Sequence, residues 1–545
     1  MMRIKIVNGT VIDGSGADRF QADVLVENDR IVKIGDCSAE AADKVIDAAG
    51  KIVAPGFIDS HTHSDFSVLY DGRAENRITA GVTTDICGNC GIGAAPVSDE
   101  FHDTLLAYLK TRIVGNINAE LAVHWRSFDE YLTYMEGKEI AVNMVPLLAE
   151  GPVRIATMGL RQDVPTEEEM ETMRNYVREG MEAGAYGMSS GLIYLPGAAV
   201  KTPELIEMCK VVAEYGGLYT THMRDEGDNE EAAMLEAFEI SKKSGARLHV
   251  SHLKRMGVHN AADPAWLFQM FDKAAAMGVD YSFDSYPYES GMSSLLAMLP
   301  PWTGKDGVDA LVENLKNEEY RERAYNDMIN GLPNWSGFYR LTGGFPGVII
   351  ATCELPENKW MEGMFIPEIA EKMGLTPKEA FFKLLIDERC RTLIVPFITT
   401  TDCVDYISAR PDGMICTDSA TLASDGPLAK GKPHMRGYGT SGKMLSYYVR
   451  EKKVLTLEQC VRKLGALAAD RFGIVDRGYV REGYFADIVI FDKDTVKDQA
   501  TIQEPRKFTS GIEYVFVNGQ IAYEGGKQTA VRAGKVLRRK VGKKA

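Results

Sequence analysis

The chain has 545 residues, of which 45% are hydrophobic and 26% are charged, and its formal net charge is −15 at pH 7. This length predicts one large domain and a smaller one, because a single hydrophobic core stops growing well before 545 residues. The acidic balance argues against nucleic acid or an anionic membrane as a partner.

The N-terminal segment MMRIKIVNGTVIDG predicts a strand and a turn, with no apolar leader and cleavage site. No run of about 18 apolar residues occurs, so no membrane span is expected. Nine cysteines are spread along the chain, which favours free or metal-bound thiols in a reducing cytoplasm. We therefore expect no disulfide between Cys87 and Cys90.

Both ends of the chain are rich in short β-branched segments that are broken by Asn-Gly, Asn-Asp and Gly. Neither end is long enough to form a solid core alone. We therefore expect residues 1–55 and 476–530 to pair into one small β-sandwich. The last residues, 531–545, are basic and are expected to form a solvated tail.

Between the two ends, strand-like and helical segments alternate. The strand-like runs are GFIDSHTH, GVTTDIC, AVNMVPLLAEG, AYGMSSGLIY, LYTTHM, RLHVSHL, VDYSFDSY and GMICTD. Thr166 and Glu169 have the spacing of a capping box at a helix start, and two further helical stretches end at Gly245 and Gly278. This alternation predicts an α/β fold with a (β/α)₈ TIM-type barrel over residues 56–475. Residues 287–346 are expected to be an insertion.

Ligand-type side chains stand at or near the ends of several of these runs, where a barrel places its chemistry. His61 and His63 are two residues apart and therefore point the same way from an extended segment. The other candidates at such ends are Cys90, His222, His252 and Asp418. Imidazole, thiolate and carboxylate are the ligands that zinc takes. The pattern therefore predicts a metal site, whereas His102, His124, His249 and His259 are expected to be structural or solvated.

The Cys-x-x-Cys of residues 87–90 has three possible roles: half of a zinc ribbon, a redox pair, or a source of one ligand. No second pair at zinc-ribbon spacing follows in the sequence, which excludes the ribbon. The choice between the other two depends on the remaining motifs.

Seven segments resemble, in order, motifs of the N-acyl-D-amino-acid deacylases (D-aminoacylases), a family of the amidohydrolase superfamily. They are APGFIDSHTHSD, GVTTDICGNCGIGAAPV, GAYGMSSGLIYLPG, TTHMRDEG, VSHLK, DSYPY and MICTDSATLASDGPLAKGKPHMRGYGT. The resemblance covers about residues 1–525 and implies a metal-dependent (β/α)₈ barrel with a small β-sandwich.

The resemblance also implies the ligands of the metal. The Gly-Asn-Cys-Gly segment of this family supplies one thiolate to zinc, which here is Cys90, and Cys87 becomes a passive neighbour. Cys90, His222 and His252 resemble the tight zinc site, and His61 and His63 resemble a second site that is often weaker or empty. Residues 185–194 contain no lysine, so the carbamylated lysine of the hydantoinase and dihydroorotase branches is absent there.

The implied reaction is zinc-dependent hydrolysis of the amide bond of N-acyl-D-amino acids. Asp418 matches the general acid and base, whereas Asp425 resembles a turn residue before Gly426. Arg436 matches the family's carboxylate-binding arginine. Lys254 and Tyr286 are expected to assist substrate binding, and Ser190 is expected to lie near the acyl group.

One departure from the family stands beside the third strand. Relatives commonly have a Gly-His where this chain has Ala149-Glu150, and we expect Glu150 to form a salt bridge with Arg154. Two alternative activities are ring opening of a cyclic amide, as in dihydroorotases and hydantoinases, and deacylation of other N-acyl amines. The sequence leaves open the acyl group, the side chain, strict D-specificity, the number of metal ions and the oligomeric state.

Overall fold

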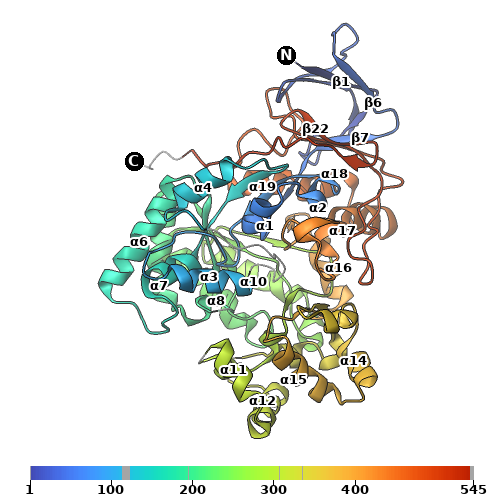
Figure 1. Ribbon diagram of the computed structural model, residues 1–545. Helices are drawn as coiled ribbons and strands as arrows, with labels where there is room; N and C mark the ends of the chain where they lie inside the picture. Colours follow the sequence, from blue (N-terminus) through green and yellow to red (C-terminus); the bar gives the residue numbers. More distant parts are fainter. Residues whose placement is uncertain (1, 113–122, 194, 306, 334, 541–545) are drawn as a thin grey trace.

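The computed structural model describes residues 2–112, 123–193, 195–305, 307–333 and 335–540. Figure 1 shows a β-rich region near the N-terminus, a central barrel surrounded by helices, and a helical region that projects from the opposite side of the barrel.

Eight parallel segments form the barrel wall, and each of the eight strand-like runs supplies one of them. The strands are β8 (Phe57–Asp59), β9 (Val82–Cys87), β10 (Asn143–Pro146) with β11 (Leu148–Ala149), β12 (Gly187–Gly191), β13 (Leu218–His222), β14 (Arg247–Val250), β15 (Tyr281–Ser285) and β19 (Met414–Ile415). Each pairs in parallel with its neighbour in chain order. The predicted fold class is therefore confirmed.

The barrel closes between its last and first strands, at the carboxyl ends. The Asp418 amide donates to the His61 carbonyl at 3.0 Å, and the His63 amide donates to the Ser419 carbonyl at 3.1 Å. This closure brings two candidate site segments side by side, although about 350 residues separate them in the sequence.

Helices cover the outside of the barrel. They are α1 (Ser64–Tyr70), α2 (Glu75–Ile78), α3 (His102–Arg112), α4 (Phe128–Glu136), α5 (Glu150–Met158), α6 (Glu167–Glu182), α7 (Thr202–Glu214), α8 (Glu230–Ser244), α9 (Val258–Ala261), α10 (Ala265–Ala276), α16 (Thr401–Ser408), α17 (Arg436–Lys443), α18 (Leu457–Lys463) and α19 (Ala466–Phe472). The Thr166–Glu169 capping box starts α6 as predicted. Gly245 ends α8 in the left-handed conformation.

Strands from both termini form the small β-region. One sheet contains β1 (Arg3–Val7), β4 (Asp23–Glu27), β5 (Arg30–Gly35) and β6 (Lys44–Asp47). The other contains β2 (Thr10–Val11), β3 (Phe20–Gln21), β7 (Ile52–Pro55), β20 (Ile488–Phe491), β21 (Ile512–Val517), β22 (Gln520–Glu524) and β23 (Lys527–Gln528). Because β7 pairs with β20, the two ends of the chain share one sheet, as expected. Asn518 and Gly519 both have positive φ and form the predicted hairpin turn between β21 and β22.

The insertion is longer than residues 287–346. Its elements are β16 (Ser293–Ser294), α11 (Val308–Asn314), α12 (Glu318–Asn330), α13 (Phe338–Leu341), β17 (Val348–Thr352), α14 (Ile366–Met373), α15 (Pro377–Asp387) and β18 (Leu393–Pro396). Residues from Leu295 to Ile394 share one hydrophobic core, and β18 pairs with both β16 and β17. The expected boundary at 346 is therefore wrong, because the segment after it completes the insertion's own core and sheet.

The basic tail also differs from expectation over residues 531–540. The Gly534 amide donates to the Ile140 carbonyl, and the Lys535 carbonyl accepts from the Met144 amide, both at 2.9 Å. Arg538 pairs with Glu136 at 2.6 Å and also with Asp129. This part of the tail is therefore docked beside β10, while residues 541–545 lie outside the described residues. No helix in the described part of the chain has the length and apolarity to cross a membrane.

Candidate active site

Four side chains from different barrel strands bring their donor atoms together at the carboxyl end of the barrel. The Cys90 sulfur lies 3.3 Å from His252 Nε2, 3.7 Å from His222 Nδ1 and 3.3 Å from His61 Nε2. Cys90 follows β9, His222 ends β13, His252 follows β14 and His61 follows β8. The thiol is thus at the centre of three imidazoles.

These spacings fit a zinc ion. Zinc binds thiolate sulfur at about 2.3 Å and imidazole nitrogen at about 2.1 Å in tetrahedral geometry, so two such ligand atoms lie about 3.6 Å apart. The sulfur-to-nitrogen distances of Cys90 to His222 and His252, 3.7 and 3.3 Å, are close to this value. A zinc ion therefore suits the donor types and spacing of Cys90, His222 and His252.

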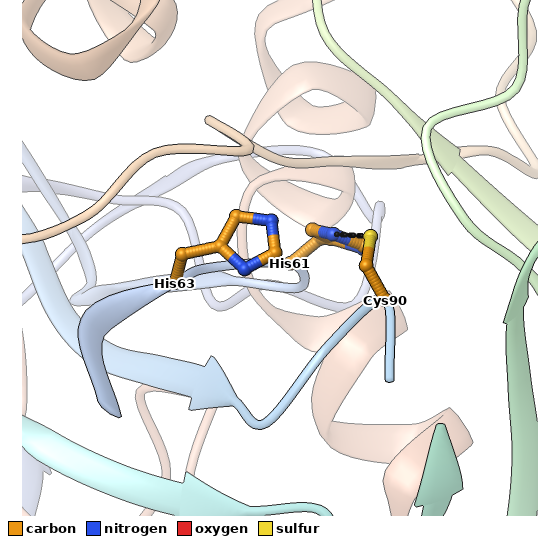
Figure 2. A group of neighbouring side chains, drawn as sticks. All are labelled: His61, His63 and Cys90. Carbon is orange, nitrogen blue, oxygen red and sulfur yellow. Dashed lines mark hydrogen bonds between the residues drawn. The ribbon is translucent and has the colours of Figure 1, made fainter. Parts of the chain in front are cut away.

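A second group of donors adjoins the first. His63 Nε2 lies 3.2 Å from Asp418 Oδ1, and His61 Nε2 lies 3.7 Å from the same oxygen. Figure 2 shows the two imidazoles beside Cys90, with the Cys90–His61 contact drawn as a dashed line. The Nδ1 atoms of His61 and His63 are buried without a hydrogen-bond partner among the described residues. Cys90 therefore faces both donor groups.

Glu226 orients the imidazoles of the first group. Its carboxylate lies 3.1 Å from His252 Nδ1 and 3.4 Å from His222 Nε2, which are the ring nitrogens turned away from Cys90. Lys254 Nζ donates to Glu226 at 2.7 Å. A carboxylate behind ligand imidazoles fixes their orientation and raises their basicity. Glu226 follows His222 by four residues in the sequence, so a single short segment supplies both a candidate ligand and the carboxylate that orients it.

Burial disfavours the charged forms of the Cys90 and His222 side chains. It raises the pKa of the Cys90 thiol well above its ordinary value, and the Asp418 and Glu226 carboxylates add to the effect. Burial also lowers the pKa of His222 to about 3. A cation changes this balance, because a coordinating thiol gives up its proton and neutral imidazoles are the ligand form. The electrostatics of the cluster are therefore consistent with a cation site.

Asp418 stands between the donors and a guanidinium. Arg436 Nη1 lies 2.9 Å from Asp418 Oδ2, while Oδ1 faces the two histidines. Burial by itself would raise the pKa of Asp418, but Arg436 and His252 hold it well below the ordinary value. The carboxylate is therefore ionised in a buried place, with one oxygen directed at the donor cluster.

Three of these residues have an unusual backbone conformation. Cys90, His252 and Asp418 have φ values of 53°, 39° and 47°. Non-glycine residues rarely adopt this left-handed region, and where they do the strain is often found at functional sites. The backbone therefore turns sharply after three barrel strands, and in each case the turn is at the residue that supplies the donor atom.

Buried polar side chains inside the barrel hold these segments in place. Asp284 accepts from the His252 amide, from Ser60 Oγ at 2.9 Å and from His249 Nε2 at 3.0 Å. Asp59 accepts from the Thr417 amide at 2.9 Å. His249 is thereby structural, as expected.

The donors open into a cavity of about 160 Å³. Arg436, Lys254 and Tyr286, three of the residues expected to bind substrate, line it, and the Arg436 guanidinium carbon lies 4.5 Å from the centre of the Tyr286 ring. Burial raises the pKa of Tyr286 to about 12, so the phenol stays protonated. His434 also lines the cavity and accepts from the Arg436 amide at 3.0 Å. His434 was not among the residues predicted from the sequence, although it lies only two residues before Arg436.

Ser190 differs from its predicted role. Its hydroxyl is buried 2.8 Å from Tyr219 Oη and 3.0 Å from Thr221 Oγ1. It is not among the described residues that line the cavity. The substrate-binding assignment of Ser190 is therefore corrected to a structural contact between neighbouring strands.

The expected salt bridge between Glu150 and Arg154 is also wrong. Arg154 pairs with Glu204 at 2.5 Å. Both Glu150 oxygens are buried without a hydrogen-bond partner in the described part of the chain. Burial raises the pKa of Glu150 to about 7, against the opposing effect of Arg154. The competing carboxylate comes from α7, which sequence spacing alone could not reveal.

Cys87 and Asp425, which the sequence analysis compared with Cys90 and Asp418, lie outside the donor cluster. Cys87 is buried, and its sulfur contacts the Val145 carbonyl oxygen at 3.7 Å. Asp425 has a side chain that is 75% exposed and pairs with Arg73 at 2.6 Å. Neither residue lines the cavity within the described residues.

Comparison with known proteins gives consistent matches over almost the whole chain. The model of the amidohydrolase family matches residues 44–321 and 417–523. A D-aminoacylase from Alcaligenes xylosoxydans xylosoxydans is 32% identical, with 98% of this chain and 97% of the relative covered. An N-acyl-D-glutamate deacylase from the same organism is 34% identical, with 98% and 96% covered.

A solved structure agrees with these sequence matches. The crystal structure of N-acyl-D-glutamate deacylase from Bordetella bronchiseptica, complexed with zinc and a phosphonate inhibitor that mimics the tetrahedral intermediate, has a TM-score of 0.80. It is 30% identical and covers 98% of this chain and 99% of its own. The similarity therefore includes the barrel, the insertion and the β-region.

Proposed function

This chain belongs to the N-acyl-D-amino-acid deacylase family of the amidohydrolases, and from that premise we propose that it is a zinc-dependent hydrolase of the amide bond of N-acyl-D-amino acids. The products are a carboxylic acid and a D-amino acid. The observation that supports this most strongly is the convergence of Cys90, His222 and His252 beside the Asp418–Arg436 pair in one cavity.

We propose that Cys90, His222 and His252 hold one zinc ion tightly, because Glu226 orients both imidazoles behind them. His61 and His63, with Asp418 at their edge, would form a second and weaker site that shares Cys90. Zinc at such a site lowers the pKa of a water molecule to about 7 and polarises a carbonyl group.

Asp418 would act as the general base and then as the general acid. Its Oδ1 is directed at the donor cluster, so it would accept a proton from the attacking water and later donate it to the leaving nitrogen. Arg436 contacts the other oxygen and keeps the carboxylate oriented between the two transfers.

Arg436 would also bind the carboxylate of the substrate. Its planar guanidinium suits bidentate recognition of a carboxylate, and Tyr286 packs against the guanidinium within the same cavity. Lys254 is engaged with Glu226, so its main contribution would be to hold that orienting carboxylate in its ionised form.

We also propose a cytoplasmic location, because all nine cysteines are free and buried. The expected partner is a small-molecule N-acyl amino acid, and the oligomeric state is left open.

A substrate panel with metal analysis tests the function. We expect purified protein to contain zinc and to release acetate from N-acetyl-D-amino acids in preference to the L-enantiomers. Chelation should abolish turnover, and added zinc should restore it. Ring opening of hydantoins or dihydropyrimidines without release of a carboxylic acid would instead support the cyclic-amide alternative. Release of a carboxylic acid only from N-acyl amines that lack an α-carboxylate would support the second alternative, deacylation of other N-acyl amines.

A further inference from the structure

A second, larger cavity adjoins the first at the mouth of the barrel. It has a volume of about 1220 Å³, compared with about 160 Å³ for the cavity that holds the donor cluster. Ile193, Glu226, Met256 and Phe338 line both cavities. We call them the inner cavity and the outer cavity, and these four residues form the boundary between them.

The outer cavity has an apolar wall that the barrel and the insertion build together. The barrel contributes Leu195, while the insertion contributes Leu299, Trp302, Trp335 and Leu341. Apolar and aromatic linings of this kind are typical of sites that bury a hydrophobic part of a ligand.

Cationic and anionic side chains are equal in number among the described residues that line the outer cavity. Arg224 pairs with Glu236 at 2.8 Å, and Asp225 accepts from the Ser336 hydroxyl at 2.6 Å. Lys201 and Lys305 are exposed. The outer cavity therefore offers hydrophobic surface more than a place for a second charge.

The outer cavity lies across the barrel mouth from Asp418 and Arg436. Three of the boundary residues, Ile193, Glu226 and Met256, follow the fourth, fifth and sixth barrel strands, β12, β13 and β14. Asp418 and Arg436 follow the eighth strand, β19, and neither lines the outer cavity within the described residues. A ligand that joins Arg436 to the outer cavity therefore spans the inner cavity, which the donor cluster also lines.

This arrangement fits the two ends of a linear N-acyl amino acid. The α-carboxylate and the acyl chain lie on opposite sides of the scissile amide. With the carboxylate at Arg436 and the amide at the donor cluster, the acyl chain extends toward Ile193, Met256 and Phe338.

We propose that the outer cavity is an acyl-chain subsite, and that the preferred substrates are N-acyl-D-amino acids with a medium or long aliphatic acyl group. This inference rests on the proposed function. It adds an acyl-chain preference, since an acetyl group is too short to extend far into the outer cavity. Burial of each additional methylene group is expected to improve kcat/KM by about threefold.

A chain-length series tests the proposal. The zinc-loaded protein is assayed with one D-amino acid that bears acetyl, butanoyl, hexanoyl or octanoyl groups. From acetyl to octanoyl, kcat/KM is expected to rise at least about 30-fold, which corresponds to the burial of about three of the six additional methylene groups. A second series keeps the acetyl group and lengthens the amino-acid side chain. The proposal is overturned if kcat/KM stays constant or falls as the acyl group lengthens. It is also overturned if kcat/KM rises only when the amino-acid side chain lengthens.

A blocking variant tests the location of the subsite. Ala198 is exposed on the short helix Gly197–Ala199 and lines the outer cavity, so we expect Ala198→Trp to remove most of the octanoyl advantage and to leave the acetyl rate within about twofold. Ala275→Trp, on the exposed side of α10, is the matched control and should retain the advantage. Equal behaviour of the two variants would overturn the proposal.

A binding measurement separates failure of this inference from failure of the proposed function. Calorimetry with octanoate and acetate should show at least tenfold tighter binding of octanoate to wild type, and loss of that difference in Ala198→Trp. If no N-acyl-D-amino acid is hydrolysed but octanoate binds in this way, the proposed function fails and the apolar subsite stands. If octanoate and acetate bind wild type equally, the subsite is rejected.

Discussion

The two ends of the barrel use buried polar groups in opposite ways. At the base, Asp487 accepts from Arg477, from the Asn518 amide at 2.7 Å and from Asn143 at 3.3 Å. Asn518 in turn donates to Asn143 Oδ1 at 2.8 Å. At the mouth, buried nitrogens of His61 and His63 and both oxygens of Glu150 have no hydrogen-bond partner among the described residues.

This difference indicates that the polar groups at the base stabilise the fold, whereas those at the mouth serve the reaction. The network at the base joins the start of β10 to the region around β21, so it fastens the barrel to the β-region. A buried polar group without a partner costs free energy, and the mouth retains several of them close to one another. The mouth of a TIM-type barrel is where active sites occur, whereas conserved polar groups at its base serve stability.

The largest expected effect is at the mouth. Asp418→Asn should lower kcat by about 10³-fold or more, because an amide cannot accept and return a proton. Zinc content should remain near one ion per chain, since Cys90, His222 and His252 are unchanged. Steady-state kinetics and metal analysis on the same preparation measure both. Near-normal turnover would reject Asp418 as the general base.

The corresponding change at the base should affect stability and leave the chemistry intact. Arg477→Met leaves Asp487 as a buried carboxylate without its cation, so the free energy of unfolding should fall by about 3 to 5 kcal/mol. Urea unfolding measures this loss. The KM and kcat of the folded fraction should stay within about twofold of wild type. A large change in KM without loss of stability would contradict the division between base and mouth.

Glu150 provides a pH-dependent test of the mouth. Burial raises its pKa from an ordinary value of 4.5 to about 7, while Arg154 and Arg224 oppose the rise and Glu204 adds to it. The folded state therefore keeps a proton that the unfolded chain loses above about 4.5. This contribution to stability is fully present below that pH and is lost as pH rises through about 7.

The variant Glu150→Gln should remove this dependence. The stability of Glu150→Gln relative to that of wild type should rise by about 2 to 3 kcal/mol between pH 5 and pH 8, because the wild-type carboxyl loses its proton over this range and the amide does not titrate. Urea unfolding at both pH values gives the comparison. Parallel changes in the two proteins would show that the Glu150 carboxyl does not titrate in this range.

The smallest effect is expected at Ser190. Because its hydroxyl bonds to Tyr219 and Thr221 away from the cavity, Ser190→Ala should change kcat/KM by less than about twofold. The lost hydrogen bonds should reduce stability by about 1 kcal/mol. A rise of tenfold or more in KM would restore Ser190 to the substrate-binding set.

Local pattern was enough to predict the eight barrel strands and the positions of the candidate ligands. His61, His63, His222 and Asp418 stand at the ends of apolar runs, and Cys90 follows the second run after a short loop. In a parallel barrel all such ends lie on one face, so the order of strands along the chain already implies a shared site. The pairing of the two termini followed from their strand-rich composition in the same way.

Tertiary structure alone decided which groups compete for the same partner. Arg154 is four residues from Glu150, yet it pairs with Glu204 on another helix. The insertion ends beyond residue 346 because its core needs β17, α14, α15 and β18, and residues 531–540 dock because β10 offers them free backbone groups. Periodicity records which face of an element is buried, whereas the identity of the neighbour on that face depends on how distant segments pack.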